Sequence, residues 1–461
     1  MTRTLVKETP KKVGKKVLLK GWVDRRRDHG QLVFVDLKDR SGVVQIVGEE
    51  KLSQLRIADV IEIEGTVKKR PAGLINPKLE TGKIEVKVAK AKVLAASADL
   101  PFDLRGEGKQ IGEETRLKYR YLDLRRPRLV RNLERRHQMI KFIRDWLDQK
   151  GFLEIETPLL TKSTPEGARD FIVPSRLQPG KFYALPQSPQ QYKQLLMVAG
   201  FEKYFQIARC LRDEDLRADR QLEFTQLDLE MSFVEREDVL AIVEELMVDL
   251  SQAMGKKIFK KPFPRIEYQE AMEKYGGDKF DLRDKKEGHV FAFAFVVDQP
   301  LFEWKKEEKR WDAMHHPFTA PNPQDIPWLK KGKVEKVRSW QYDLVCNGEE
   351  VGGGSIRITD PKIQTKVFEI MGHTKEQVKK KFGHLLQAFE YGVPPHGGIA
   401  LGLDRLVALF TGEDSIREVI AFPVTSSGQT AVMDAPSEVD EIQLKELGLK
   451  VVKKGNGEKG D

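Results

Sequence analysis

Charged residues of both signs crowd two consecutive segments of the sequence. Residues 212–221 read as a polar loop, and residues 223–231 alternate polar and apolar side chains as a β-strand does. Because strand side chains alternate between faces, one face carries Gln226, Asp228 and Glu230. Beside an arginine-rich loop, this face could bind a small ligand with positive and negative groups, such as a nucleotide together with an amino acid. A solvated charged hairpin is the alternative for this stretch taken alone, since surface charge is common.

A second pair of acids flanks Asn347-Gly348, a dipeptide that strongly favours a two-residue hairpin turn. Counting outward from the turn pairs Val345 with Glu350 and Asp343 with Gly352. Asp343 and Glu350 then lie diagonally on one face, roughly 7 to 8 Å apart at the backbone. Both can reach one cation, and two oxygen ligands completed by substrate phosphates are a common way to hold magnesium. A purely structural hairpin is the alternative.

Glycines and basic residues that could also contact a ligand follow in the sequence. Residues 352–354 are three glycines whose bare backbone would admit a flat or bulky ligand, and Arg357 projects farther along the same strand. Residues 397–406 read as a glycine-flanked apolar strand that runs into a helix, with Arg405 near its first turn. The paired histidines at 315–316 lack a third ligand at suitable spacing, which disfavours a metal role for them.

A helix is predicted to begin at Ser188. Ser188 would cap the helix, Pro189 would occupy its first turn and Gln191 would reach back in a capping box. Gln190 and Lys193 are three positions apart and therefore share one face of this helix. Polar residues in a first helical turn need no function, so this segment carries weight only together with the others.

Composition is that of a globular protein: the chain has 461 residues, 40% hydrophobic and 33% charged, enough for two or more domains. No apolar run is long enough for a membrane span and no signal-like segment occurs, so we expect a cytoplasmic protein without a membrane partner. Cys210 and Cys346 lie in apolar strand patterns without metal-ligand spacing, which predicts two buried thiols. The net charge of +9 favours a polyanionic partner, although many basic proteins bind no nucleic acid.

The N-terminal part of the sequence predicts a five-stranded barrel of the oligonucleotide-binding type, with strands at residues 17–23, 31–37, 43–47, 58–67 and 83–94. Phe34 faces outward on the second strand, close to a basic cluster ending at Arg27 and to Gln45, where a base could stack. A Phe packed under a loop is the alternative. Farther on, strands and helices mix without regular alternation, which favours an antiparallel sheet flanked by helices.

Taken together, these segments resemble the signature motifs of class II aminoacyl-tRNA synthetases, and their sequences are similar to those of bacterial aspartyl-tRNA synthetases. The likeness rests on residues 21–27, 164–170, 184–193, 212–230 and 402–405 and extends to 435–436. It implies an α+β fold, with an oligonucleotide-binding barrel at 1–104, a hinge at 105–129 and a class II antiparallel sheet flanked by helices at 130–451. The polar residues 452–461 are predicted to form a flexible tail.

The resemblance implies ATP-dependent attachment of L-aspartate to tRNA-Asp through an aspartyl-adenylate. Arg212 would bridge the α-phosphate and the substrate carboxylate, and Arg405 would hold the γ-phosphate. The remaining ATP contacts would come from Asp213, Glu214, Gln221, Phe224, Glu350, Gly402, Leu403 and Asp404. Asp343 and Glu350 would bind Mg²⁺. The aspartate pocket would comprise Lys193 and Arg357 on the β-carboxylate together with Arg212, Glu166, Gln190, Asp228 and His315.

In the resembled family the barrel reads the anticodon. Phe34 and Gln45 would meet its central U, with further contacts from Arg27, Asn76 and Glu85. His29 stands where family members confined to tRNA-Asp have leucine. Together with Gly73, it leads to the hypothesis that tRNA-Asn is charged as well.

Two further expectations follow from the resemblance. The helix from Val130 and the strand ending at Pro158 match the motif that forms a homodimer interface. The usual bacterial inserted domain, of roughly a hundred residues, is replaced here by a short link at 284–289. A sister synthetase for asparagine or lysine, and a non-catalytic RNA-binding relative, are the competing interpretations.

Overall fold

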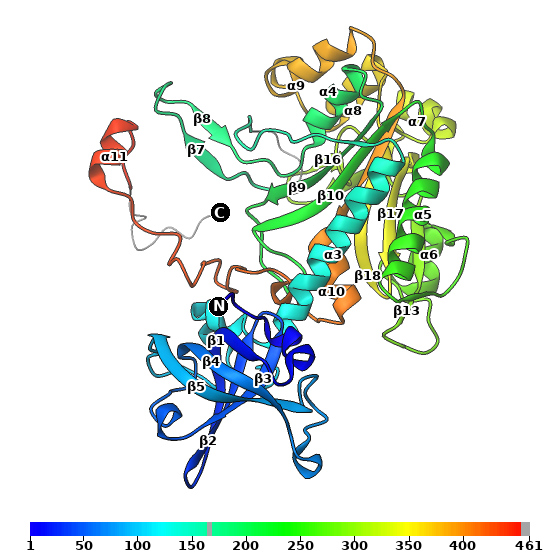
Figure 1. Cartoon of the computed structure of the whole chain (residues 1–461). Helices are drawn as coiled ribbons and strands as arrows, with labels where there is room; N and C mark the ends of the chain where they lie inside the picture. Colours follow the sequence, from blue (N-terminus) through cyan, green and yellow to red (C-terminus); the bar gives the residue numbers. More distant parts are fainter. Residues whose placement is uncertain (164–167, 453–461) are drawn as a thin grey trace. The chain divides into compact units, whose positions relative to one another are not determined.

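The computed structural model describes residues 1–163 and 168–452, and it comprises two compact units, Met1–Asp103 and Leu104–Asp461 (Figure 1). Glu166 and nearly all of the predicted tail lie outside the described residues. None of the helices in the described part of the chain combines the length and apolar character needed to cross a bilayer.

The N-terminal unit is a closed barrel with the strand order β1-β2-β3-β5-β4. Its strands are β1 (Lys16–His29), β2 (Leu32–Asp39), β3 (Gly42–Gly48), β4 (Val60–Lys69) and β5 (Ile84–Ala95). Alternate residues of β2, namely Val33, Val35 and Leu37, are buried in the barrel core. The predicted barrel is therefore confirmed. β1 is longer than expected because it continues past a β-bulge and pairs Arg27 with Phe34 of β2.

The C-terminal unit is built on an eight-stranded sheet with the order β12-β14-β17-β18-β19-β10-β9-β6. Its strands are β6 (Leu153–Glu154), β9 (Lys203–Leu211), β10 (Glu223–Ser232), β12 (Arg265–Glu267), β14 (Phe293–Val297), β17 (Gln341–Cys346), β18 (Glu349–Ile356) and β19 (His396–Gly402). All inner pairs are antiparallel, and only β12 with β14 and β6 with β9 are parallel. The antiparallel sheet inferred from the mixed pattern is thus confirmed.

One face of this sheet forms the main core. Apolar side chains of α3 (Pro127–Gln149), α5 (Arg236–Ala253) and α10 (Leu403–Thr411) pack with Leu227 and Leu229 of β10 in a single buried cluster. The other face carries polar residues. A smaller apolar cluster joins α4 (Gln190–Val198), α8 (Pro361–Ile370) and α9 (Lys375–Phe389).

Shorter elements complete the C-terminal unit: α1 (Glu113–Lys118), α2 (Arg120–Asp123), α6 (Tyr268–Tyr275), α7 (Ile326–Lys330), α11 (Glu441–Glu446), and the strand pairs β7 (Ile172–Pro174) with β8 (Phe182–Ala184), β11 (Lys257–Ile258) with β13 (Val290–Phe291), and β15 (Phe302–Lys305) with β16 (Arg310–Ala313). Cys210 and Cys346 are free and buried, as predicted.

The segment at 105–129 differs from the polar hinge that its arginines suggested. It contains α1, α2 and the first turn of α3, which begins at Pro127 rather than Val130. Asp123 is fully buried and pairs with Arg116, Arg120 and Arg126, the last over 2.6 Å. Glu418 lies 2.9 Å from Arg116 and 3.9 Å from Arg120, so two acids share the positive charge of these arginines, which explains why an arginine-rich sequence folds here instead of remaining solvated.

Candidate active site

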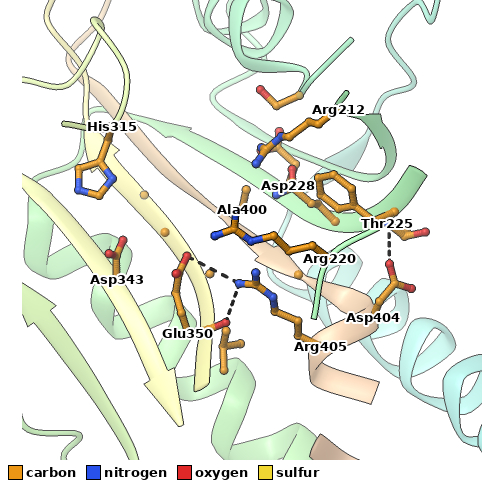
Figure 2. Close-up of a pocket in the computed structure, with 18 of the residues that line it drawn as sticks. Arg212, Arg220, Thr225, Asp228, His315, Asp343, Glu350, Ala400, Asp404 and Arg405 are labelled. Carbon is orange, nitrogen blue, oxygen red and sulfur yellow. Dashed lines mark hydrogen bonds and ion pairs between the residues drawn. The ribbon is translucent and has the colours of Figure 1, made fainter. Parts of the chain in front are cut away.

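A cavity of about 320 Å³ opens on the polar face of the sheet (Figure 2). β10, β17, β18 and β19, together with α4, α10 and the loop after β9, supply its lining. The structure brings together these predicted site residues: Gln190, Lys193, Arg212, Glu214, Gln221, Phe224, Asp228, His315, Asp343, Glu350, Arg357, Gly402, Asp404 and Arg405. Segments far apart in the sequence thus converge on one concave surface.

Two predicted residues of the described chain, Leu403 and Asp213, are not part of this lining. Leu403 is fully buried in the main core, and Asp213 points to Arg169, at 3.6 Å. Contact of their side chains with ATP is therefore not supported by the structure. Glu166 lies outside the described residues. The predicted capping box is wrong: Pro189 is the N-cap of α4, and the side-chain amide of Gln191 has no hydrogen-bond partner in the described part of the chain.

Asp228 and Lys193 form a buried ion pair at the floor of the cavity, with 2.6 Å between Oδ1 and Nζ. The second carboxylate oxygen, Oδ2, is buried and has no hydrogen-bond partner among the described residues. Burial raises the pKa of Asp228, against the opposing effect of Lys193. A cationic group entering the cavity would satisfy the open oxygen, so Asp228 suits an ammonium group.

Glu230, which had no predicted role, holds Arg357 in place. Its two oxygens accept hydrogen bonds from Nε and Nη2 of Arg357 at 2.8 and 3.0 Å, and Oε2 lies 3.4 Å from Nζ of Lys193. Burial opposes the charge, but Arg357 and Lys193 together lower the pKa of Glu230 to about 2. The alternation along β10 had already placed Glu230 beside Asp228, and this was the signal available in the sequence.

His316 was also missed. Burial and the neighbouring Arg357 lower the pKa of His316 well below its usual value, so its neutral Nε2 accepts a hydrogen bond from Nη1 of Arg357 at 2.7 Å. Nη1 of Arg357 also donates to the hydroxyl of Ser355 at 2.6 Å. These bonds and those to Glu230 account for four of the five N–H groups of Arg357 within the described residues, leaving one for a ligand.

The acids of the second hairpin lie on adjacent strands, β17 and β18. The predicted pairing of Val345 with Glu350 is confirmed, but Asp343 pairs with Gly353 rather than Gly352 because a β-bulge shifts the register. The extra residue of the bulge is Val351, which is buried in the core. Beyond it, the alternation is displaced by one position.

Asp343 and Glu350 differ in their partners. The Glu350 carboxylate lies 3.2 Å from Lys279 and 3.9 Å from Arg405, and although burial opposes its charge, these cations lower its pKa. Burial raises the pKa of Asp343, whose hydrogen bonds come from the neutral amides of Gln299 and Gln341. A buried carboxylate whose hydrogen bonds come from neutral amides fits a divalent cation that takes its other oxygens from substrate. The described residues contain no cluster of three or more potential metal-ligating side chains.

Arginines surround the opposite end of the cavity. Arg405 donates to the carboxylate of Asp219 at 3.1 Å. It also donates to the carbonyl of Glu350 at 3.1 Å (Figure 2). The guanidinium of Arg212 lies over the ring of Phe224, 5.1 Å from its centroid. The amide of Gln221 is engaged by backbone groups, since its Oε1 accepts from Val424 N at 3.0 Å. Two cations facing one hollow suit a polyanionic chain such as a triphosphate.

Asp404 lines the cavity, yet its carboxylate is occupied by the protein itself. Oδ2 accepts from the backbone N–H of Thr225 at 2.8 Å (Figure 2). Oδ1 pairs with Arg136 of α3. Asp404 thereby connects α10, β10 and α3, and this explains its position better than a contact with nucleotide.

The predicted base-reading residues lie either on the strands of the barrel or in the connection between β4 and β5. Arg27 donates to Gln45 at 3.4 Å, and Gln45 donates to Glu85 at 3.1 Å. The ring of His29 meets the half-buried Phe34 edge-on, with 5.7 Å between centroids. Asn76 and Gly73 lie in the connection between β4 and β5, where Oδ1 of Asn76 accepts from the backbone N–H two residues ahead.

Two protein families match the chain. Residues 112–426 match the family described as tRNA synthetases class II (D, K and N), and residues 17–94 match OB-fold nucleic acid binding domains. The matches correspond to the sheet unit and the barrel, respectively.

Curated relatives are similar over almost the whole chain. The aspartate–tRNA(Asp/Asn) ligase of Dictyoglomus turgidum is 45% identical over 575 residues, covering 96% of each chain. The protein of the same name from Caldanaerobacter subterraneus is 43% identical over 581 residues, again covering 96% of each.

Solved structures show the same fold. The asparaginyl-tRNA synthetase of Pyrococcus horikoshii, complexed with asparaginyl-adenylate, has a TM-score of 0.74 and 26% identity, covering 92% of this chain and 98% of that one. The aspartyl-tRNA synthetase of Entamoeba histolytica has a TM-score of 0.73 at 22% identity, covering 92% and 91%, and this likeness concerns the fold alone.

Proposed function

The chain belongs to the class II tRNA synthetases of the aspartate, lysine and asparagine group, and on this premise we propose that it joins L-aspartate to tRNA through an aspartyl-adenylate made from ATP. The observation that carries the choice of amino acid is the pair of buried cations, Lys193 and Arg357, at the cavity floor. Each is held by an acid of β10, and both are directed to the same part of the cavity.

The cation pair favours aspartate over its sister amino acids. A side-chain carboxylate can accept hydrogen bonds from Lys193 and from the remaining N–H of Arg357, whereas asparagine would bring an N–H donor against a donor. A site built to hydrogen-bond a particular group rejects an analogue that leaves its buried polar groups unpaired. Lysine would place a third ammonium beside two cations. Asp228, with its open Oδ2, is suited to the α-ammonium group.

The remaining charged residues suit the chemistry of adenylate formation. Arg212 would stabilise the negative charge that develops on the α-phosphate during attack by the aspartate carboxylate, and Arg405 would bind the terminal phosphates. Phe224 offers a ring for adenine, and Glu214 lies in the loop that closes this end. ATP is a substrate here. A magnesium ion held by Asp343 and Glu350 would neutralise phosphate charge when bound.

The barrel is proposed to read the tRNA anticodon, and both tRNA-Asp and tRNA-Asn are proposed as acceptors. The support is His29, seated against Phe34, together with relatives that are named for both tRNAs. Steady-state aminoacylation of the two purified tRNAs tests this. Catalytic efficiencies within about a thousandfold, equivalent to about 4 kcal/mol, are expected, and a larger ratio contradicts dual use.

ATP–pyrophosphate exchange with aspartate, asparagine and lysine tests the amino acid and the catalytic proposal together. We expect exchange with aspartate only, and its loss in Arg212→Ala. Exchange that persists in Arg212→Ala would contradict the role of this arginine. Absence of exchange in the wild-type protein would favour the non-catalytic alternative, which has no support among the comparisons.

Three secondary proposals accompany the function. A homodimer is supported by β6 at the edge of the sheet and by the exposed apolar side chains of Leu153, Leu159 and Leu160 next to it. Cytoplasmic location follows from the substrates. Absence of the bacterial insertion at 284–289 is supported by alignments to relatives that span 575 residues or more, longer than this chain of 461.

A further inference from the structure

Two glutamine side chains hold the carboxylate of Asp343, and neither has a part in the function proposed above. Nε2 of Gln299 donates to Oδ2 at 2.7 Å, and Nε2 of Gln341 donates to Oδ1 at 2.9 Å. Both glutamines are buried, with 0% and 4% of their surface exposed. A carboxylate with a donor at each oxygen cannot turn without breaking one of these bonds, so the direction of Asp343 is fixed.

The Gln299 amide is engaged at both ends. Its Oε1 accepts a hydrogen bond from Nε2 of His315 at 2.5 Å, while its Nε2 faces Asp343. Because an amide oxygen only accepts, Nε2 of His315 must carry the proton. His315 lines the cavity, so this chain of hydrogen bonds joins one wall of the site to the proposed metal ligand.

The Gln341 amide is engaged at one end only. Its Oε1 is buried and has no hydrogen-bond partner in the described part of the chain, although Gln341 lines the same cavity as Asp343 and Glu350. An unpaired buried acceptor costs about 1–3 kcal/mol. Gly353 leaves room for the arrangement, because a Cβ there would lie 2.5 Å from Oδ1 of Asp343 and 3.1 Å from Nε2 of Gln341.

We propose that Gln299 and Gln341 are positioning residues that aim Asp343 at the divalent cation, and that Oε1 of Gln341 accepts a hydrogen bond from a water molecule bound to that cation. The inference rests on the proposed function, since it presupposes magnesium at Asp343 and Glu350. Neutral amides orient the Asp343 carboxylate without cancelling its charge, which remains for the metal. Outer hydrogen bonds of this kind typically change metal affinity by about 10- to 100-fold.

Gln341→Leu tests the inference, because leucine keeps the approximate volume and removes both polar ends. The probe is Mn²⁺, titrated in the presence of saturating ATP and followed by the electron paramagnetic resonance signal of the free ion. We expect the dissociation constant for Mn²⁺ to rise by at least about tenfold. Binding of aspartate in the absence of ATP and metal should stay unchanged.

Gln364→Leu is the matched control. Gln364 is also buried, donates through Nε2 to the carbonyl of Pro317 at 2.8 Å and leaves its Oε1 unpaired, but it does not line the cavity. Its substitution should leave Mn²⁺ affinity unchanged. Equal Mn²⁺ affinity in Gln341→Leu and wild type, or an equal loss in both variants, overturns the inference.

If Gln341→Leu does not fold, Gln341→Asn is tested in its place. Asparagine stays polar but is one methylene too short to reach Asp343, so this variant should also bind Mn²⁺ more weakly. Retained affinity in that variant overturns the inference too. A wild-type protein that binds no Mn²⁺ with ATP would instead refute the magnesium site, and therefore the proposed function, before any variant is compared.

Discussion

Glu230 and Arg357 form a buried two-point ion pair, with 2.8 and 3.0 Å between carboxylate oxygens and guanidinium nitrogens. The acid comes from β10 and the arginine from the end of β18, two strands that are separated in the sheet by β19. Glu230 thereby fixes the orientation of Arg357, the cation proposed to bind the aspartate side chain.

Glu230→Gln should impair both stability and aspartate binding, because it leaves the buried charge of Arg357 without its partner. We expect a loss of about 3–5 kcal/mol in the free energy of unfolding. The KM for aspartate should rise at least about tenfold, equivalent to about 1.4 kcal/mol. Chemical denaturation and pyrophosphate exchange measure the two effects. Glu154→Gln breaks the half-exposed pair with Arg144 and should cost less than about 1 kcal/mol.

Glu230 should also make stability depend on pH. Its pKa is about 2 in the folded protein and near 4.5 when unfolded, so its contribution is present above pH 4.5 and is lost as the pH falls toward 2. The difference in unfolding free energy between wild type and Glu230→Gln should therefore shrink below pH 4.5, by an amount on the order of 3 kcal/mol. A difference that stays constant with pH would contradict the ion pair. Denaturation at matched pH values in both proteins provides the measurement.

Gly398→Ala should disturb the same pair from the opposite strand. A Cβ at Gly398 would lie 2.2 Å from Oε2 of Glu230 and 2.0 Å from the carbonyl of Leu229, so β19 or the carboxylate must move. We expect a loss of about 1–3 kcal/mol and a higher KM for aspartate. Gly383→Ala is the control: this glycine lies within α9, where a Cβ would make only an ordinary contact, 3.6 Å from Cγ of Lys379, and alanine there should stabilise by about 0.5–1 kcal/mol.

Asp404→Asn separates a structural role from ATP binding. The substitution retains an acceptor for Thr225 but removes the charge that pairs with Arg136, so the unfolding free energy should fall by about 3–5 kcal/mol. At a temperature where the variant is folded, the KM for ATP should stay close to that of wild type. Arg405→Ala, by contrast, should impair ATP use with little loss of stability. A higher KM for ATP in Asp404→Asn, without a loss of stability, would instead support the contact between Asp404 and ATP that was predicted from the sequence.

His29→Leu should change the choice of tRNA and leave adenylate formation unaffected. Leucine can pack against the edge of Phe34 but offers no hydrogen bond to a base, so tRNA-Asn should lose efficiency relative to tRNA-Asp by about tenfold, or about 1.4 kcal/mol. Aminoacylation of both tRNAs measures the ratio, and pyrophosphate exchange without tRNA is the internal control. An unchanged ratio would show that discrimination resides elsewhere.

Much of the fold could be read from periodicity. Alternation along β10 correctly separated the core residues Leu227 and Leu229 from the polar face, and the Asn347-Gly348 turn located the second hairpin. These features are local, so a short window of sequence contains them. The bulge at Val351 was not predicted, because nothing in the valine side chain distinguishes a bulge residue from a regular strand residue.

The missed part of the site depends on distant partners. Gln299 reaches Asp343 from a separate segment, whereas Gln341 lies two positions before Asp343 on β17, and neither glutamine belongs to a short motif with a chemical signature. Glu230 was visible as an acid on the correct face, but its partner comes from another strand. Side-chain pairing of this kind is a property of the assembled sheet, and one sequence without its fold does not contain it in readable form.

The bulge in β18 shifts by one position the alternation of side chains between the two faces of the sheet. An odd number of positions separates Glu350 from Arg357, which in an uninterrupted strand would turn them to opposite sides of the sheet, yet both line the cavity. Two deletions of equal size thus have opposite consequences. Deletion of Val351 would remove a core side chain but should keep Arg357 directed at the cavity, whereas deletion of Ser355, beyond the bulge, should turn that arginine toward the apolar core. A one-residue deletion within the bulge thus preserves the cavity-facing and core-facing sides of the hairpin, and one beyond the bulge exchanges them.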